Sequence, residues 1–116
     1  MSIAFIVLSL LLALAFAAAG VPKLTGAAKM REQLDGIGVS RELATTIGAL
    51  ELVAAAGLIV GIWFTSIGIA AAVGLALLTA GAAIFHVRAG DTKNLAGPVV
   101  LLVLAIATAA IGMTVL

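Results

Sequence analysis

The stretch LATTIGALELVAAAGLIVGI, residues 43–62, decides the fold of this chain. It contains a single charged side chain, Glu51, and is otherwise made of apolar, small and hydroxyl-bearing residues. A helix of about 20 residues rises ~30 Å, which is the thickness of the hydrocarbon core of a bilayer. Because a chain in lipid must satisfy its backbone hydrogen bonds internally, the stretch predicts a membrane-spanning helix.

The composition of the rest of the chain agrees with a membrane protein. Hydrophobic residues make up 65% of the 116 positions and charged residues 9%, whereas a soluble domain has roughly 45–50% and 25%. The absence of cysteine excludes disulfides and thiolate metal sites. The net charge of +1 gives no general attraction to nucleic acid. We therefore predict one membrane-embedded domain over residues 1–116.

Three further apolar stretches have a similar length. The predicted transmembrane helices cover residues 3–20, 43–62, 66–85 and 95–116. The strands of a β-barrel would be about half as long and would alternate polar with apolar residues, which these stretches do not. The predicted fold class is an all-α membrane protein, a four-transmembrane-helix bundle.

The first stretch has an alternative interpretation, because the Ala-Ala-Ala run at residues 17–19 resembles a signal-peptidase site. A signal peptide normally begins with a positively charged segment, and the Met-Ser-Ile start has none. We therefore expect a permanent helix.

The basic residues predict the orientation. All six Lys and Arg side chains lie in two connections, residues 21–42 and the segment after Phe85. The turn at residues 63–65 and both ends of the chain carry no side-chain charge. The positive-inside rule places the two charged connections in the cytoplasm and both termini outside. Trp63 and Phe64 are then expected to anchor the opposite surface.

The first connection predicts a short amphipathic helix between transmembrane helices 1 and 2. Its apolar residues recur every three or four positions, as expected for a helix at the headgroup level. They are Ala27, Met30, Leu34 and Ile37. We expect Thr25 to cap this helix, the glycines at 36 and 38 to end it, and Ser40 to cap the next helix. The helix is either a lipid-facing connector or a lid over a cavity.

Small residues within the spans predict close helix packing. The pair Gly57-x-x-x-Gly61 fits the spacing that lets two helices approach backbone to backbone. The pattern is compatible with contacts inside the bundle and with contacts between copies of a homo-oligomer.

Three ionisable residues are expected in the cytoplasmic half of the bundle. Glu51 lies ~12–16 Å below the end of its helix, where a carboxylate costs roughly 2.5–3.5 kcal/mol on insertion scales. Lys23 follows Pro22, and a proline kink there could turn it toward the bundle. His86 closes the third span. Each of three helices therefore contributes one ionisable group.

Each of these groups has a structural and a functional interpretation. Lys23 is either a snorkelling interface anchor or an interior partner, and His86 either caps helix carbonyls or acts in a site. Glu51 either locks the bundle as a protonated carboxyl or serves a ligand. In the functional interpretation Lys23, Glu51 and His86 bind a quinone or similar lipophile. Glu51 and His86 are then the candidate catalytic acid–base pair.

The other polar residues are expected to be structural. Arg88, Asp91 and Lys93 are predicted to be solvated topology determinants, and Thr79 is predicted to bond to its own helix. One histidine and no cysteine cannot supply paired histidine ligands to a haem or hold an iron–sulfur cluster. Any part in electron transfer would therefore use a bound quinone or a partner that carries the cofactor.

Short motifs in this sequence resemble the DoxX-like membrane proteins. They are GVPKL at residues 20–24, GALEL at residues 48–52 followed by Gly57 and Gly61, and His86 at the end of the third span. The resemblance covers essentially the whole chain. It implies that Lys23, Glu51 and His86 are the site positions, and that relatives include thiosulfate:quinone oxidoreductase subunits and small accessory proteins of stress response or membrane assembly.

Two functions follow as hypotheses. The first is an accessory or assembly subunit of a membrane redox or stress-response system, which docks a cytoplasmic or membrane protein partner on its basic side. The second is a membrane enzyme or binding protein for a quinone or other lipophile. For both we expect a multi-pass protein of a bacterial plasma membrane, and whether it is an enzyme stays open.

Overall fold

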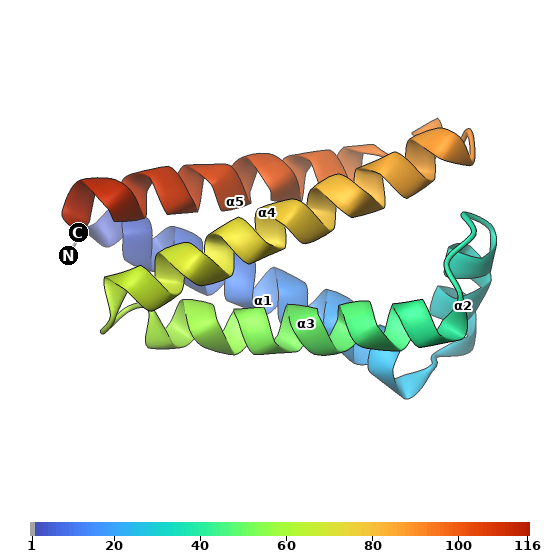
Figure 1. The fold of residues 1–116 in the computed structure, drawn as a ribbon, viewed down its shortest axis with the longest axis horizontal. Coiled ribbons are helices and arrows are strands. Elements are labelled where there is room, and N and C mark those ends of the chain that lie inside the picture. The colour runs from blue at the N-terminus through green and yellow to red at the C-terminus, as the bar shows by residue number, and fades with distance from the viewer. Residues whose placement is uncertain (1) are drawn as a thin grey trace.

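The computed structural model describes residues 2–116, which form four long helices and two short ones (Figure 1). They are α1 (Ile3–Thr25), α2 (Ala28–Asp35), α3 (Arg41–Val60), α4 (Thr65–Arg88), the 3-10 turn η1 (Thr92–Asn94) and α5 (Ala96–Val115). Four of the helices are long and apolar enough to cross a membrane. The predicted all-α bundle with a short helix between its first two spans is confirmed.

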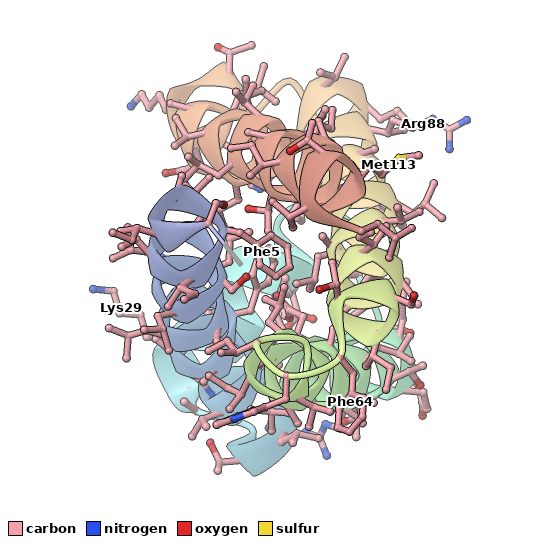
Figure 2. All side chains as sticks on the ribbon, turned by 90° about the vertical axis from the view of Figure 1, so that its left-hand side faces the viewer. Phe5, Lys29, Phe64, Arg88 and Met113 are labelled. Atoms are coloured by element: carbon pink, nitrogen blue, oxygen red, sulfur yellow. The ribbon has the colours of Figure 1, made fainter. Side chains whose placement is uncertain are left out.

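The long helices form an up-and-down ring. Figure 2 shows the ring from one end, with α1 between α3 and α5, and α4 on the opposite side between the same two helices. Neighbours in the ring are therefore antiparallel. The start of α1 and the end of α5 lie at one end of the bundle, and α2 and η1 lie at the other, which we call the charged end (Figure 1).

The end opposite the charged end is tightly closed. Phe5 is completely buried there and points into the bundle (Figure 2). A Cβ atom added to Gly112 would lie 2.8 Å from the Phe5 ring, and one added to Gly68 would lie 3.1 Å from it. These two glycines of α4 and α5 therefore leave the space that the Phe5 ring fills.

The middle of the bundle is packed with aliphatic and aromatic side chains. The buried cluster contains Leu12, Ala13, Phe16, Ala55, Leu58, Ala72, Leu75 and Ala105. Glycines bring α3 close to α4. A Cβ atom added to Gly57 of α3 would lie 3.1 Å from Cβ of Ala71 of α4, and one added to Gly61 at the end of α3 would collide with the backbone of Gly68 of α4. The Gly57-x-x-x-Gly61 pattern therefore packs α3 against α4 within one chain.

The first helix is longer than predicted. It was expected to end at residue 20, but it continues through Pro22 to Thr25. Proline removes one hydrogen bond without ending the helix, and the left-handed Gly26, with φ of 69°, stops it. The Thr25 hydroxyl donates to the carbonyl of Val21 at 3.0 Å, so the prediction that Thr25 caps α2 is wrong.

The other helix boundaries lie within a few residues of the prediction. The hydroxyl of Ser40 accepts a hydrogen bond from the amide of Leu43 at 3.2 Å, which confirms it as the cap of α3. Helix α4 runs past the predicted residue 85 to Arg88, so His86 lies inside its last turn. The Thr79 hydroxyl donates to the carbonyl of Leu75 at 2.9 Å, as predicted.

The segment after α2 folds back onto the bundle. Ile37 and Val39 are buried and form a small hydrophobic cluster with Ala44. Leu34 of α2 and Phe85 of α4 pack against this cluster. The apolar side of the first connection thus faces the other helices, which favours the lid over the lipid-facing connector. At the opposite end Trp63 and Phe64 are 72% and 62% exposed, and Phe64 points away from the bundle (Figure 2).

Candidate functional site

A large cavity occupies the charged end of the bundle. There the pair α1 and α3 separates from the pair α4 and α5 (Figure 1), and the space between them has a volume of about 510 Å³. All four long helices line it, and residues of α2 and of the connection that follows cover it. The volume lies within the range of roughly 300–1,000 Å³ that is typical of small-molecule sites. We call it the cleft.

An ion pair lies on the α1–α3 wall of the cleft. The Nζ atom of Lys23 is 2.6 Å from Oε1 of Glu51, about 15 Å along α3 from its first residue. Glu51 is 4% exposed, so the pair lies in the interior of the bundle. Lys23 is therefore an interior partner rather than an interface anchor.

The sequence brings the pair together through two glycines. A Cβ atom on Gly20 would lie 2.9 Å from the carbonyl oxygen of Gly48, and one on Gly48 would lie 2.9 Å from that of Gly20. Helices α1 and α3 can approach this closely only because both positions lack a side chain. Side chains lean toward the N-terminus of their own helix. Lys23 and Glu51 each lie three residues after the glycine of their own helix. Because α1 and α3 are antiparallel, these two positions lie on opposite sides of the crossing, and both side chains lean back toward it and so toward each other.

The pair keeps unused hydrogen-bonding capacity. An ammonium group offers three donors and a carboxylate two acceptor oxygens. Within residues 2–116, the contact between Lys23 and Glu51 is the sole hydrogen bond of either side chain. In that part of the chain Ser9 Oγ is the one side-chain oxygen or nitrogen that is both fully buried and without a hydrogen-bond partner. Oε2 of Glu51 also has no partner there, so it cannot be fully buried. The second oxygen of Glu51 is therefore accessible, and both residues line the cleft.

A second polar group faces the cleft from α4 and η1. The Nδ1 atom of His86 lies 3.0 Å from Oδ2 of Asp91, and the Asn94 amide donates to both oxygens of Asp91 at 3.1 and 3.2 Å. The Asn94 amide, and then the His86 ring, hold the pKa of the Asp91 carboxyl below its usual value. An ionised carboxylate only accepts, so Nδ1 of His86 donates and Nε2 is the nitrogen left for a ligand.

Asp91 and Asn94 are the site residues that the sequence analysis missed. Asp91 was predicted to be a solvated topology determinant, but the structure pairs it with His86, and both line the cleft with Asn94. The turn through Gly90, with φ of 70°, brings the Asp91 amide to the carbonyl of His86 at 2.8 Å. Arg88 is exposed, as predicted, and points away from the bundle (Figure 2).

The structure brings all three predicted site residues to the same cavity but does not pair Glu51 with His86. Each has its own partner, Lys23 for Glu51 and Asp91 for His86. Within residues 2–116, no three His, Cys, Asp or Glu side chains are grouped so that they could hold a metal ion. The cleft therefore presents two hydrogen-bonding groups on facing walls, with apolar side chains between them.

Comparison with known proteins identifies the family. A sequence model of the DoxX-like family matches residues 7–108. The chain belongs to the DoxX-like family. No curated protein and no solved structure matches it. In this DoxX-like protein the matched range includes every residue that lines the cleft, from Phe16 to Leu101. The resemblance drawn from the motifs around Lys23 and Glu51 is thus confirmed at the level of the family.

Proposed function

We propose that this DoxX-like protein binds a lipophilic molecule with an oxygen-bearing head group, of the quinone class, in the cleft. The observation that carries the proposal is the apolar cavity of about 510 Å³ with the buried Lys23–Glu51 pair on its wall. A ligand carbonyl would accept from the Lys23 ammonium, and a ligand hydroxyl would donate to Glu51. A quinone carries oxygens on opposite edges of its ring, so the second oxygen would face His86.

The position of the cleft suits a ligand that arrives from the membrane. Leu43 at the start of α3 and Leu77 in the middle of α4 both line the cleft and are 37% and 71% exposed. An exposed side chain in the middle of a transmembrane helix, such as Leu77, contacts lipid tails. A lipophile could therefore enter between α3 and α4 without passing through water.

Glu51 and His86 stay the predicted acid–base residues of any reaction in the cleft. In a quinone reaction they would exchange protons with the ring oxygens. The electrons would come from a partner that carries a redox cofactor. Asp91 and Asn94 would act as positioning residues for His86.

A side chain added inside the cleft should block binding without unfolding the bundle. Gly81 of α4 lines the cleft, and a Cβ atom added to it meets nothing within 4 Å. We expect Gly81→Leu to weaken binding of decylubiquinone at least about tenfold, because the new side chain occupies the ligand's space. Glu51→Gln should weaken it by a similar factor through the lost charge-assisted hydrogen bond. Binding is measured by titration calorimetry in lipid nanodiscs.

The matched control is Gly74→Leu. Gly74 lies two turns earlier on α4, also has open space around its Cβ position, and does not line the cleft. Its substitution should leave binding unchanged. The proposal fails if the wild-type protein takes up no more decylubiquinone than empty nanodiscs, or if Gly81→Leu and Gly74→Leu weaken binding equally.

An accessory or assembly function is the second candidate. It is favoured by the basic side chains that extend into solvent at the charged end, Lys29 and Arg88 among them (Figure 2). A protein partner that copurifies in stoichiometric amount and is released by changes in α2, but not by Glu51→Gln, would select this function. A cleft that binds no decylubiquinone would exclude the first candidate, and only the copurifying partner would select the second.

We also propose that the charged end lies in the cytoplasm of a bacterium and that both termini lie outside. The support is the positive-inside rule, since all six basic residues lie at that end. The sequence has no cysteine, so single cysteines can be introduced as reporters. In intact cells a membrane-impermeant maleimide should label Ser66→Cys and not Thr92→Cys. Labelling of Thr92→Cys alone would reverse the orientation.

A further inference from the structure

A second, smaller cavity adjoins the cleft at the charged end, and the two share lining residues such as Lys23 and Leu34. It has a volume of about 140 Å³, is open to the surface, and is lined by the end of α1, by α2 and by the start of α3. Its charged lining residues are Lys23, Arg31, Asp35 and Arg41. Arg31 and Arg41 do not line the cleft, so a ligand that they bind is independent of the ligand proposed there.

The charge around this cavity is not balanced. Within residues 2–116 the ion pairs are those of Lys23 with Glu51 and of His86 with Asp91. Lys23 is therefore already engaged, whereas Arg31 and Arg41 make no ion pair in the described part of the chain. Asp35 is the single carboxylate on the cavity wall, and it bonds to neither arginine. The cavity wall thus carries two arginines that are unpaired within residues 2–116 and one carboxylate.

The Arg31 side chain lies against the end of α1 at this cavity. A Cβ atom added to Gly26 would lie 2.6 Å from Nη2 of Arg31, so the guanidinium group lies directly on the backbone that ends α1. Gly26 has φ of 69°, a conformation that glycine adopts without strain. Arg41, which also lines the cavity, is the first residue of α3, whose amino end carries a partial positive charge.

We propose that this cavity binds a phosphate-type anion between Arg31 and Arg41. Guanidinium groups match the geometry of phosphate oxygens and form two parallel hydrogen bonds with them. The cavity lies where α1 ends and α3 begins, which is the level of the lipid headgroups for two membrane-spanning helices. The anion is thus either the phosphodiester of an anionic phospholipid or a free phosphate from solution.

The test measures retention of phosphatidylglycerol by the purified full chain. Native mass spectrometry from mixed nanodiscs should show preferential retention of phosphatidylglycerol over phosphatidylcholine. Arg31→Gln and Arg41→Gln should each weaken it about tenfold, as expected for the loss of one charge-assisted contact. Asp35→Asn should strengthen it, because the substitution removes the one opposing charge on the wall. If these residues had only a structural role, Asp35→Asn would not strengthen lipid retention while the arginine substitutions weaken it.

The controls are Lys29→Gln and Arg88→Gln. Both side chains belong to the charged end but extend away from the bundle and do not line this cavity (Figure 2). Each should change retention less than twofold. If they weaken it as much as the arginine substitutions do, the attraction belongs to the whole basic surface and the site is refuted.

Inorganic phosphate distinguishes the two sources of the anion. Displacement of the lipid by millimolar phosphate, with binding of phosphate itself lost in Arg31→Gln, assigns the site to free phosphate. Lipid retention that phosphate does not reduce assigns it to the headgroup. The proposal is overturned if the wild-type protein shows no preference for phosphatidylglycerol over phosphatidylcholine and also does not bind phosphate.

Discussion

Replacing Lys23 by methionine should destabilise the bundle by about 3–5 kcal/mol, because the Glu51 carboxylate then stays buried without its partner. The contact is short, 2.6 Å between Nζ and Oε1, and Glu51 is 4% exposed. Glu51→Gln should cost less, because the amide oxygen still accepts a hydrogen bond from Lys23. The free energy of unfolding is measured in mixed micelles by titration with a denaturing detergent.

The double variant Lys23→Met with Glu51→Leu separates the stability of the pair from its function. Replacing a buried ion pair by apolar side chains of similar volume is often neutral or stabilising, so we expect it to recover most of the lost stability. It should nevertheless bind no decylubiquinone, since no polar group remains on that wall. Lys29→Met is the matched control at an exposed position. A Lys23→Met bundle as stable as Lys29→Met would show that the pair contributes nothing.

The fold could be predicted from the sequence because lipid leaves few choices. Residues 43–62 and the other three spans must be helical wherever they cross a bilayer, and their composition alone indicates the crossing. The helix ends were less accurate. Pro22 indicates an end by its missing amide, but the structure continues to Thr25 since one absent hydrogen bond does not stop a helix that packs along its length on α3.

Lys23, Glu51 and His86 could be predicted from the sequence as site residues, but their contacts and the two further site residues, Asp91 and Asn94, could not. That Lys23 faces Glu51, 28 positions away, depends on how closely α1 and α3 cross, which only the three-dimensional structure fixes. The partner of His86 depends on a turn, because Gly90 must adopt a positive φ before Asp91 can fold back. Neither arrangement has a local sequence signal beyond the presence of a glycine.

A substitution at Gly48, where α1 and α3 cross, should also destabilise the bundle, although less than the loss of Lys23 does. Gly48→Ala should destabilise the bundle by about 1–3 kcal/mol, because the added methyl group overpacks a close backbone contact. Its Cβ atom would lie 2.9 Å from both the carbonyl oxygen of Gly20 and Cβ of Lys23. Neither atom belongs to the flexible end of a side chain, so the two helices themselves must move apart.

The same substitution in open space should have the opposite sign. A Cβ atom on Gly74 meets nothing within 4 Å, so Gly74→Ala should stabilise α4 by up to ~1 kcal/mol through the higher helix propensity of alanine. Moving α1 from α3 would also lengthen the contact of Lys23 with Glu51, so Gly48→Ala should weaken decylubiquinone binding while Gly74→Ala should not. If Gly48→Ala and Gly74→Ala shift the free energy of unfolding equally, the close approach of α1 and α3 at Gly48 is not what positions Lys23 beside Glu51.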